Sequence, residues 1–343
     1  MKIQAAIQAV IAQQDLREAE MISVMRDIMT GKTTDAQIGG FLVGLSIKGE
    51  SVTEITAAAK VMRSLALRVQ IQNPKHLVDT CGTGGDGLGL FNISTAAAFV
   101  VASAGGQVAK HGNRSISSKS GSADVLEAAG VNLAMSAEKI SKCVEQIGVG
   151  FMFAPSHHSA MKYAIKARQD LAIRTIFNVL GPLTNPANAP HQVIGVYAKN
   201  LLEPIAKVLK SLGSKRVLVV HSADGLDEIS IAAETFVAEL KDDKISTYSI
   251  NPADFNLPLG NLNDLKAADA KASLALIQQA FSGKSNSKNA SVKNIIALNA
   301  GAAIYVCGLA NSLKAGVDKA LQILSSTAAE QKLNDFIQKS QQL

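Results

Sequence analysis

Apolar residues recur at helical spacing through the first part of the chain. Ile3, Ile7 and Val10 lie three or four positions apart, which predicts an amphipathic helix. Further helices are predicted over residues 15–31, 34–47 and 55–67. Asp15 is expected to cap the second helix, and the segment SVTE that begins at Ser51 is a capping-box pattern before the fourth. Four short helices in succession predict a small helical bundle.

After residue 74 the pattern changes to short apolar segments that alternate with glycine-containing turns and helical segments. Strands are predicted at residues 76–79, 107–110, 150–153, 192–197 and 216–221. Helices are predicted at residues 95–104, 123–129, 138–147, 201–212, 267–281, 292–309 and from 313 onward. This alternation predicts an α/β fold class, with a small N-terminal helical domain and a larger α/β domain on a mostly parallel central sheet. Ligands of such sheets bind at the carboxyl ends of the strands.

Composition narrows the class of protein. Hydrophobic residues make up 47% of the 343 residues and charged residues 18%, which is typical of a globular chain and not of a disordered one. No apolar run reaches the roughly 18 residues that a membrane span needs, so no membrane association is expected. Cys81, Cys143 and Cys307 are scattered. This pattern suits a reducing cytoplasm and favours neither a disulfide framework nor a zinc site.

The chain carries a formal net charge of +6, yet aromatic residues make up only 4% of it. A protein that binds single-stranded nucleic acid needs exposed rings on which bases can stack, and no run of five basic residues is present. We therefore expect no nucleic-acid partner. A modest basic excess equally suits an enzyme that acts on small polyanions.

The stretch DTCGTGGDGLGLFNIST, residues 79–95, holds five glycines between a predicted strand and a predicted helix. Bare backbone N–H groups at a helix N-terminus form an anion site, although a glycine-rich turn without a ligand has the same pattern. Asp86 inside the loop would repel a bare pyrophosphate, which argues against a dinucleotide fingerprint and fits contact with hydroxyls or a metal ion. Asn92, Ser94 and Thr95 are candidates for helix caps or for phosphate and Mg²⁺ ligands.

Two further loops follow predicted strands. Lys110, Arg114 and Lys119 lie among several serines, a composition that is typical of a phosphate-binding loop and also of a solvated basic loop. Asp227 and Glu228 follow the strand at 216–221 and supply the hard oxygen ligands that suit Mg²⁺, although an exposed acidic turn has the same sequence.

The segment from Ala154 to Pro186 adds histidines and arginines. His157 and His158 are adjacent, without the spacing of a zinc site. Arg168 and Arg174 lie on or after one predicted helix. Either guanidinium could grip a substrate carboxylate or form a surface ion pair, and their spacing leaves the choice open.

Several of these motifs occur together and in order. They are GTGGD at 82–86, NIST at 92–95, KHGNR at 110–114, SSKSGSADVLEA at 117–128, FAPSHH at 153–158, IRTIFNVLGPLTNP at 173–186 and DE at 227–228. Along the whole chain the sequence resembles the anthranilate phosphoribosyltransferases of tryptophan biosynthesis. The resemblance implies a fold similar to that of the pyrimidine nucleoside phosphorylases. It also implies a helical domain of residues 1–70, joined by part of 159–186, and a catalytic domain of residues 75–343.

The resemblance also implies the site residues. Phosphoribosyl diphosphate would bind to Gly82, Gly85, Asp86, Leu90, Asn92, Ile93, Ser94, Thr95, Lys110, His111, Gly112, Asn113, Arg114, Ser115, Ile116, Ser117, Ser118 and Ser122. Anthranilate would bind to Gly82, Asn113, His158 and Arg168. Ser94, Asp227 and Glu228 would hold Mg²⁺, with two ions per subunit. Lys110 would stabilise charge without a protein general base, and the subunits would form homodimers through the helical domain.

Two departures from the family pattern stand out. Leu90 occupies a position where relatives often have Thr, and Ser159 replaces the usual Pro after the histidine pair. A pyrimidine nucleoside phosphorylase is a rival with the same fold, but the acid pair and the extra cationic loop favour a diphosphate donor over inorganic phosphate. A nucleic-acid-binding relative is the other rival. It would be expected to lack the acid pair or Asn113, both of which are present.

Overall fold

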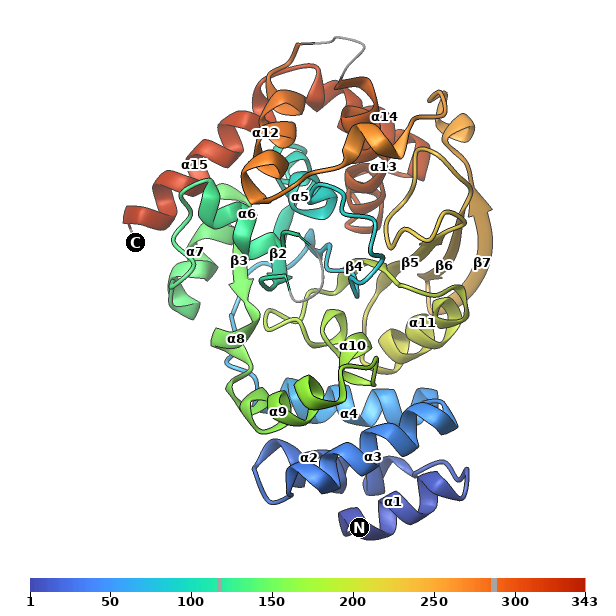
Figure 1. Cartoon of the computed structure of the whole chain (residues 1–343). Coiled ribbons are helices and arrows are strands. Elements are labelled where there is room, and N and C mark those ends of the chain that lie inside the picture. Colours follow the sequence, from blue (N-terminus) through green and yellow to red (C-terminus); the bar gives the residue numbers. More distant parts are fainter. Residues whose placement is uncertain (116–118, 285–288, 343) are drawn as a thin grey trace.

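The computed structural model describes residues 1–115, 119–284 and 289–342. A bundle of four helices forms one end of the molecule and the α/β part forms the other (Figure 1). The bundle consists of α1 (Ile3–Ile11), α2 (Glu18–Met29), α3 (Asp35–Lys48) and α4 (Val52–Leu65). The capping box before α4 is confirmed, because the Ser51 side chain accepts from Glu54 N–H while Glu54 accepts from Ser51 N–H at 2.8 Å.

The prediction that Asp15 caps the second helix is wrong. Arg17 is the residue that precedes α2, and the Asp15 carboxylate instead pairs with Lys48 at the end of α3. Lys48 also contacts the fully buried Glu54 at 2.8 Å, and Glu54 accepts a hydrogen bond from Leu16 N–H at 3.0 Å. Asp15 therefore helps to close the turn between helices and does not start a helix.

The central sheet has seven strands in the order β3-β2-β1-β4-β5-β6-β7. The first five in chain order pair in parallel, and the last two pair antiparallel at one edge, so the predicted mostly parallel sheet is confirmed. Their bounds are β1 Leu77–Asp79, β2 Gln107–Gly112, β3 Val149–Phe153, β4 His191–Gly195, β5 Arg216–Ser222, β6 Thr235–Lys241 and β7 Lys244–Ile250.

The edge hairpin β6–β7 was not predicted from the sequence. Asp242 and Asp243 join its strands with φ of 49° and 60°, a turn in which both central residues adopt the left-handed conformation. Most of β7 is exposed or half-buried, so its residues lack the apolar run that marks the interior strands.

Helices cover both faces of the sheet. The helices that follow the bundle are α5 (Ile93–Ser103), α6 (Ser122–Ala128), α7 (Ala137–Ile147), α8 (Ala154–His157), α9 (Lys162–Leu171), α10 (Phe177–Leu180), α11 (Leu202–Ser211), α12 (Ala270–Phe281), α13 (Ala290–Val306), α14 (Leu313–Leu324) and α15 (Ala328–Gln342). The segment predicted as one helix from residue 313 onward is two helices, because the chain turns at Ser325 and Ser326.

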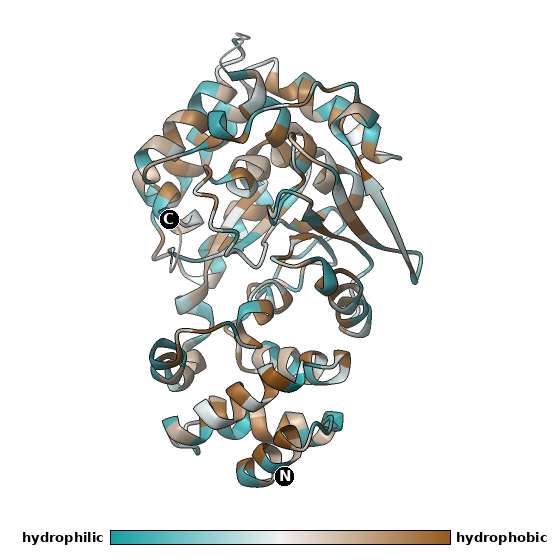
Figure 2. Cartoon of the chain, turned by 45° about the vertical axis from the view of Figure 1, so that its right-hand side comes forward, coloured by the Kyte–Doolittle hydropathy of each residue, from teal (hydrophilic) through white to brown (hydrophobic). Residues whose placement is uncertain are grey.

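The two faces of the sheet belong to two different hydrophobic cores. In β5, Leu218 and Val220 join the core under α5 and α13, whereas Val217 and Val219 join the core that includes α11 and the helical bundle. Successive side chains of a strand point to opposite faces, so one buried strand serves both cores. Figure 2 shows apolar residues concentrated in the interior of both parts.

One helix from the middle of the chain returns to the bundle. Helix α9 packs against α2 and α3, and its Ala164 and Ala167 belong to the same buried core as the bundle residues. The domain limits suggested by the sequence, residues 1–70 with part of 159–186 and residues 75–343, stay a prediction. Within the described residues, no helix combines the length and the apolar character that crossing a membrane requires.

The end of α9 generates a prediction for stability. Ala172 caps this helix with φ of 49°, in the left-handed region that glycine adopts without strain. We expect Ala172→Gly to raise the free energy of unfolding by about 0.5–1 kcal/mol, since relief of the strain outweighs the added freedom of the unfolded chain. Urea unfolding measures the change.

Ala12→Gly is the matched control for that variant. Ala12 is also an exposed cap residue, but its φ is −78°, which alanine adopts freely. Glycine should therefore lower stability at Ala12 and raise it at Ala172. A loss of stability at both positions would contradict the strain.

Candidate active site

The carboxyl ends of β1 and β2 are joined by a buried carboxylate. Asp79 is completely buried, and its two oxygens accept hydrogen bonds from His111 N–H at 3.1 Å and from the Asn185 side-chain amide at 2.7 Å. The same amide donates to Ala109 O at 2.8 Å. Burial raises the pKa of Asp79 to about 6, against the attraction of the neighbouring Lys110. Asp79 therefore holds together the backbone at the carboxyl ends of β1 and β2.

Lys110 extends from β2 toward the first turn of α5. Its side chain is buried, and its ammonium donates to Thr80 O at 3.1 Å and to Ser94 Oγ at 3.1 Å. A buried ammonium is stable only when nearby oxygens or anions compensate for its lost hydration. Lys110 thus holds a positive charge at the point where the glycine-rich loop enters α5.

The glycine-rich loop lies against the acidic loop after β5. Gly84 N–H donates to Asp227 Oδ2 at 2.7 Å. At Gly82 a methyl group would lie 2.9 Å from Asp227 Oδ2, and at Gly195 it would overlap the Asp227 carbonyl oxygen. Only glycine allows this approach of backbone to backbone. Gly195, at the end of β4, is a residue whose part in the site was missed by sequence reasoning.

Three acidic side chains, Asp86, Asp227 and Glu228, interact electrostatically where these loops converge. Burial and the neighbouring Asp86 raise the pKa of Asp227 to about 6. Burial and Asp227 raise the pKa of Glu228 to about 8, while Ser94 N–H hydrogen-bonds to Glu228 and opposes the rise. Burial also raises the pKa of Asp86. A cation at this place would relieve the repulsion among the three carboxylates.

The oxygen ligands at this place suit an Mg²⁺ ion that is also bound by other groups. Across residues 1–115, 119–284 and 289–342, no three Asp, Glu, His or Cys side chains form a cluster that could hold a metal ion. Mg²⁺ is commonly held by one or two carboxylates together with water and substrate phosphates. Asp227, Glu228 and Ser94 fit such a shared site, in which the substrate completes the set of ligands.

The loop after β2 is hydrogen-bonded to Asn92, the residue that precedes α5. The Asn92 side-chain amide donates to Ser120 O at 3.2 Å, and its oxygen accepts from Ser120 Oγ at 3.2 Å and from Ser273 Oγ at 2.9 Å. Asn92 precedes α5 without capping it through its side chain. The asparagine therefore joins the two predicted phosphate loops and does not act as a simple helix cap.

Arg114 turns toward α6. Its guanidinium contacts Glu127 at 2.6 Å and Asp124 at 3.2 Å, and lies 5.7 Å from the centre of the Phe153 ring. The rest of this loop is compact. Ser122 Oγ donates to Asn113 O at 3.4 Å, and a methyl group on Gly112 would overlap Ser122 Oγ. Asp124 also accepts from Ser115 N–H at 3.0 Å, so Arg114 and Ser115 are both held by carboxylates of α6.

The remaining positions predicted to contact phosphoribosyl diphosphate differ in their exposure. Ile93 and Thr95 are buried in the first turn of α5, and within the described part of the chain the Thr95 hydroxyl has no hydrogen-bond partner. Leu90 is half-buried and forms a β-bridge with Lys266. Ile116, Ser117 and Ser118 lie outside the described residues.

Two buried histidines, His111 of β2 and His158 after α8, lie next to each other. The rings of His111 and His158 lie 5.1 Å apart, and His111 Nδ1 lies 3.1 Å from Gly181 O. Burial lowers the pKa of His111 to about 3 and that of His158 to about 4, so both rings are neutral at pH 7. The Nε2 atoms of both rings are buried without a hydrogen-bond partner among the described residues.

The two arginines that the sequence could not separate have different surroundings. The Arg168 guanidinium lies 5.3 Å from the Phe177 ring, and burial lowers its pKa. Within the described chain Arg168 forms no ion pair with a carboxylate. Arg174 instead donates to Gly85 O at 2.6 Å. Neither arginine is paired with a carboxylate in the described residues, but Arg174 donates to the glycine-rich loop and Arg168 does not.

Comparisons with known proteins show the family to which this chain belongs. Residues 74–330 match the model of the glycosyl transferase family a/b domain, and residues 4–66 match that family's helical bundle domain. The chain is 74% identical over 340 residues to the anthranilate phosphoribosyltransferase of Ruthia magnifica subsp. Calyptogena magnifica, covering 99% of both sequences. The chain belongs to the anthranilate phosphoribosyltransferase family.

Solved structures of anthranilate phosphoribosyltransferases agree with this assignment. The enzyme from Thermus thermophilus has a TM-score of 0.92 and 39% identity, covering 98% of this chain and 99% of that one. The enzyme from Saccharomyces cerevisiae in complex with PRPP and Mg has a TM-score of 0.89 and 26% identity, covering 99% and 98%. The predicted family and fold are confirmed, and the individual site residues stay predictions.

The acid cluster of this anthranilate phosphoribosyltransferase family member predicts a pH dependence. In metal-free protein the folded state binds the Glu228 proton more tightly than the unfolded state does, since the pKa rises from 4.5 to about 8. This contribution to stability is therefore largest below pH 4.5 and is lost as the pH rises toward 8. Glutamine does not ionise, so we expect Glu228→Gln to remove this loss of stability at high pH.

Urea unfolding at a series of pH values between 4.5 and 8, with a chelator present, measures the effect. The difference in unfolding free energy between Glu228→Gln and the unmodified protein should grow as the pH rises. Two parallel curves would show that Glu228 titrates normally in the folded protein.

Proposed function

We propose that this chain transfers the phosphoribosyl group of phosphoribosyl diphosphate to the amine of anthranilate, with release of diphosphate, in tryptophan biosynthesis. The observation that carries the proposal is the hydrogen bond from Gly84 N–H to Asp227, beside Lys110 and Ser94. It joins the glycine-rich loop to the acid pair, next to a buried cation, at the carboxyl ends of the strands. A magnesium-chelated diphosphate matches this set of groups.

The donor would lie across the glycine-rich loop and the loop after β2. Backbone N–H groups of the first loop and the N-terminus of α5 suit the phosphates, and Lys110 suits the charge that develops on the leaving diphosphate. Asp227, Glu228 and Ser94 would hold Mg²⁺, and we propose two ions per subunit. When bound, Mg²⁺ would supply positive charge that neutralises the diphosphate as it leaves.

Anthranilate would bind between the donor and the bundle, at Gly82, Asn113, His158 and Arg168. Arg168 supports this placement because it is half-buried and carries a guanidinium without an internal carboxylate partner in the described residues. A planar guanidinium and a carboxylate form a bidentate pair. Since Arg174 is held by Gly85, the carboxylate is assigned to Arg168.

The reaction depends more on the orientation of the two substrates than on a general base. The bond between C1 of the ribose and the diphosphate oxygen breaks, the arylamine nitrogen bonds to C1, and the nitrogen then loses a proton to water. An arylamine is neutral at pH 7, and the low pKa of His111 makes its ring a poor proton acceptor. Lys110 and the backbone N–H groups therefore contribute by stabilising charge.

We further propose that the chain works as a cytoplasmic homodimer through its bundle. Ile11 at the end of α1 is 67% exposed, and Ile47 near the end of α3 is 73% exposed. Exposed apolar side chains on neighbouring helices favour burial against a second subunit. Sedimentation equilibrium of the purified chain tests the dimer.

The function is tested by following anthranilate fluorescence. Fluorescence should decay only when the protein, phosphoribosyl diphosphate and Mg²⁺ are all present. A parallel reaction with uridine and inorganic phosphate tests the rival nucleoside phosphorylase. Phosphorolysis of uridine without loss of anthranilate fluorescence would overturn the proposal.

Arg168→Ala should change the KM values of the two substrates to different extents. We expect the KM for anthranilate to rise roughly 10- to 100-fold, since a charge-assisted hydrogen bond contributes about 1.5–3 kcal/mol. The KM for phosphoribosyl diphosphate should change much less. Lys166→Ala is the matched control, because Lys166 lies on the same helix with a side chain that is 73% exposed. Equal rises in both KM values would place Arg168 outside the anthranilate site.

A further inference from the structure

Arg174 is the one arginine of the motif IRTIFNVLGPLTNP, and the proposed reaction gives it no part. Its Nη2 donates to Gly85 O at 2.6 Å, and its guanidinium carbon lies 3.9 Å from the centre of the Tyr197 ring. Its own carbonyl accepts a hydrogen bond from Ser46 Oγ of α3 at 3.4 Å. One residue therefore contacts the glycine-rich loop, the segment after β4 and the helical bundle.

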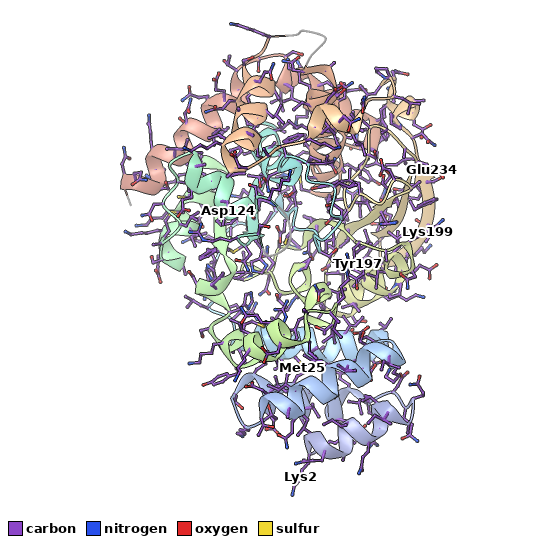
Figure 3. The ribbon with its side chains drawn as sticks, viewed as in Figure 1. Lys2, Met25, Asp124, Tyr197, Lys199 and Glu234 are labelled. Carbon is purple, nitrogen blue, oxygen red and sulfur yellow. The ribbon has the colours of Figure 1, made fainter. Side chains whose placement is uncertain are left out.

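Tyr197 is itself bound to the glycine-rich loop. Its backbone N–H donates to Thr83 Oγ1 at 3.1 Å, and Thr83 N–H donates to Gly195 O at 2.8 Å. Figure 3 shows Tyr197 near the middle of the molecule, within the α/β part. The aromatic ring thus gives the Arg174 guanidinium a platform that is anchored to the same loop that the guanidinium binds. Cation–π contact of this kind also restricts the orientation of the guanidinium plane.

The hydrogen bond from Arg174 to Gly85 O restrains the whole Gly85–Asp86 peptide group and not only its carbonyl. Gly84, Gly85 and Gly87 all have positive φ, between 67° and 85°, so this part of the loop is free to adopt many other conformations. Gly85 is exposed, which leaves its peptide group without packing to hold it. In a trans peptide the C=O and the following N–H point in opposite directions. When Arg174 holds the Gly85 carbonyl, the Asp86 N–H must point away from Arg174.

We propose that Arg174, supported by Tyr197, is a positioning residue that sets the orientation of the Gly85–Asp86 peptide for the diphosphate of the donor. The proposal rests on the proposed function, because it takes this loop to be the donor site. Arg174 acts through the loop and does not touch anthranilate. The Ser46 contact also connects the loop to α3, so the bundle and the donor site share this arginine.

Kinetics of Arg174→Ala test the positioning role. We expect the KM for phosphoribosyl diphosphate to rise about tenfold, the effect of losing one hydrogen bond from a charged donor. The KM for anthranilate should rise less than about threefold, because Arg174 does not contact that substrate. Tyr197→Phe keeps the ring but loses the hydroxyl that also hydrogen-bonds to Arg174, so its donor KM should lie closer to that of the unmodified protein than the donor KM of Tyr197→Leu does. Tyr197→Leu should share part of the Arg174→Ala defect.

The matched control removes a similar contact elsewhere. The Arg216 guanidinium lies 4.7 Å from the Tyr305 ring at the start of β5, at the opposite edge of the sheet from the site. Arg216→Ala loses an arginine–tyrosine contact and should leave both KM values unchanged. A change in the donor KM of Arg216→Ala as large as that of Arg174→Ala would overturn the proposal.

Hydrogen exchange of the substrate-free protein tests the contact without any reaction. The Gly84 amide of the same loop, which donates to Asp227 Oδ2 at 2.7 Å, should exchange several-fold faster in Arg174→Ala and in Tyr197→Leu than in the unmodified protein or Arg216→Ala. Faster exchange in a protein that lacks transferase activity would count against the proposed function and leave the positioning role intact. Unchanged exchange, or equal rises in the KM values of both substrates, would overturn the positioning role.

Discussion

The buried interaction of Asp79 with the start of the loop after β2 sets the geometry of the site. The Asp79 carboxylate binds His111 N–H and Asn185, next to the buried Lys110. Removing one partner of a buried charge would leave the other without compensation, at a cost of several kcal/mol. Because these groups lie where β1 and β2 end, they hold the glycine-rich loop and the cationic loop at a fixed separation. Lys110 then reaches Ser94, and through it the first turn of α5.

The site also depends on the sheet being buried on both faces. Residues of β5 alternate between a core under α5 and α13 and a core shared with the bundle. The loops at its carboxyl edge are therefore carried on a rigid support, while Arg168 lies on α9 and Arg174 lies in the segment that leads from α9 back into the α/β part. Most residues proposed for the donor thus lie on loops of the sheet, whereas Arg168, proposed for the acceptor, lies on a helix that packs against the bundle.

Local patterns in the sequence predicted much of the fold. The spacing of Ser51 and Glu54 predicts the capping box before α4, and the apolar runs predict β1 to β5 within a few residues. The sequence did not reveal the hairpin β6–β7, whose outer strand is largely exposed. It also misassigned Asp15, because its partner Lys48 lies 33 residues away.

The candidate site was predictable in composition but not in its contacts. Glycines, Lys110 and the acid pair are visible as short motifs, and the comparisons confirm the family. The bond between Arg174 and Gly85 joins residues 89 positions apart, and the role of Gly195 depends on how closely the Asp227 backbone approaches it. Such contacts depend on how the strands and loops are brought together, which no local pattern records.

Calorimetric titration of the metal-free protein with phosphoribosyl diphosphate tests the central claim, that the converging loops are complementary to a magnesium-chelated diphosphate and repel the bare anion. With Mg²⁺ present the account predicts a saturable binding heat. With a chelator it predicts binding at least about tenfold weaker, because the Asp86 and Asp227 carboxylates repel the bare diphosphate. Equal affinity with and without Mg²⁺, or no binding heat with Mg²⁺ supplied, would contradict it.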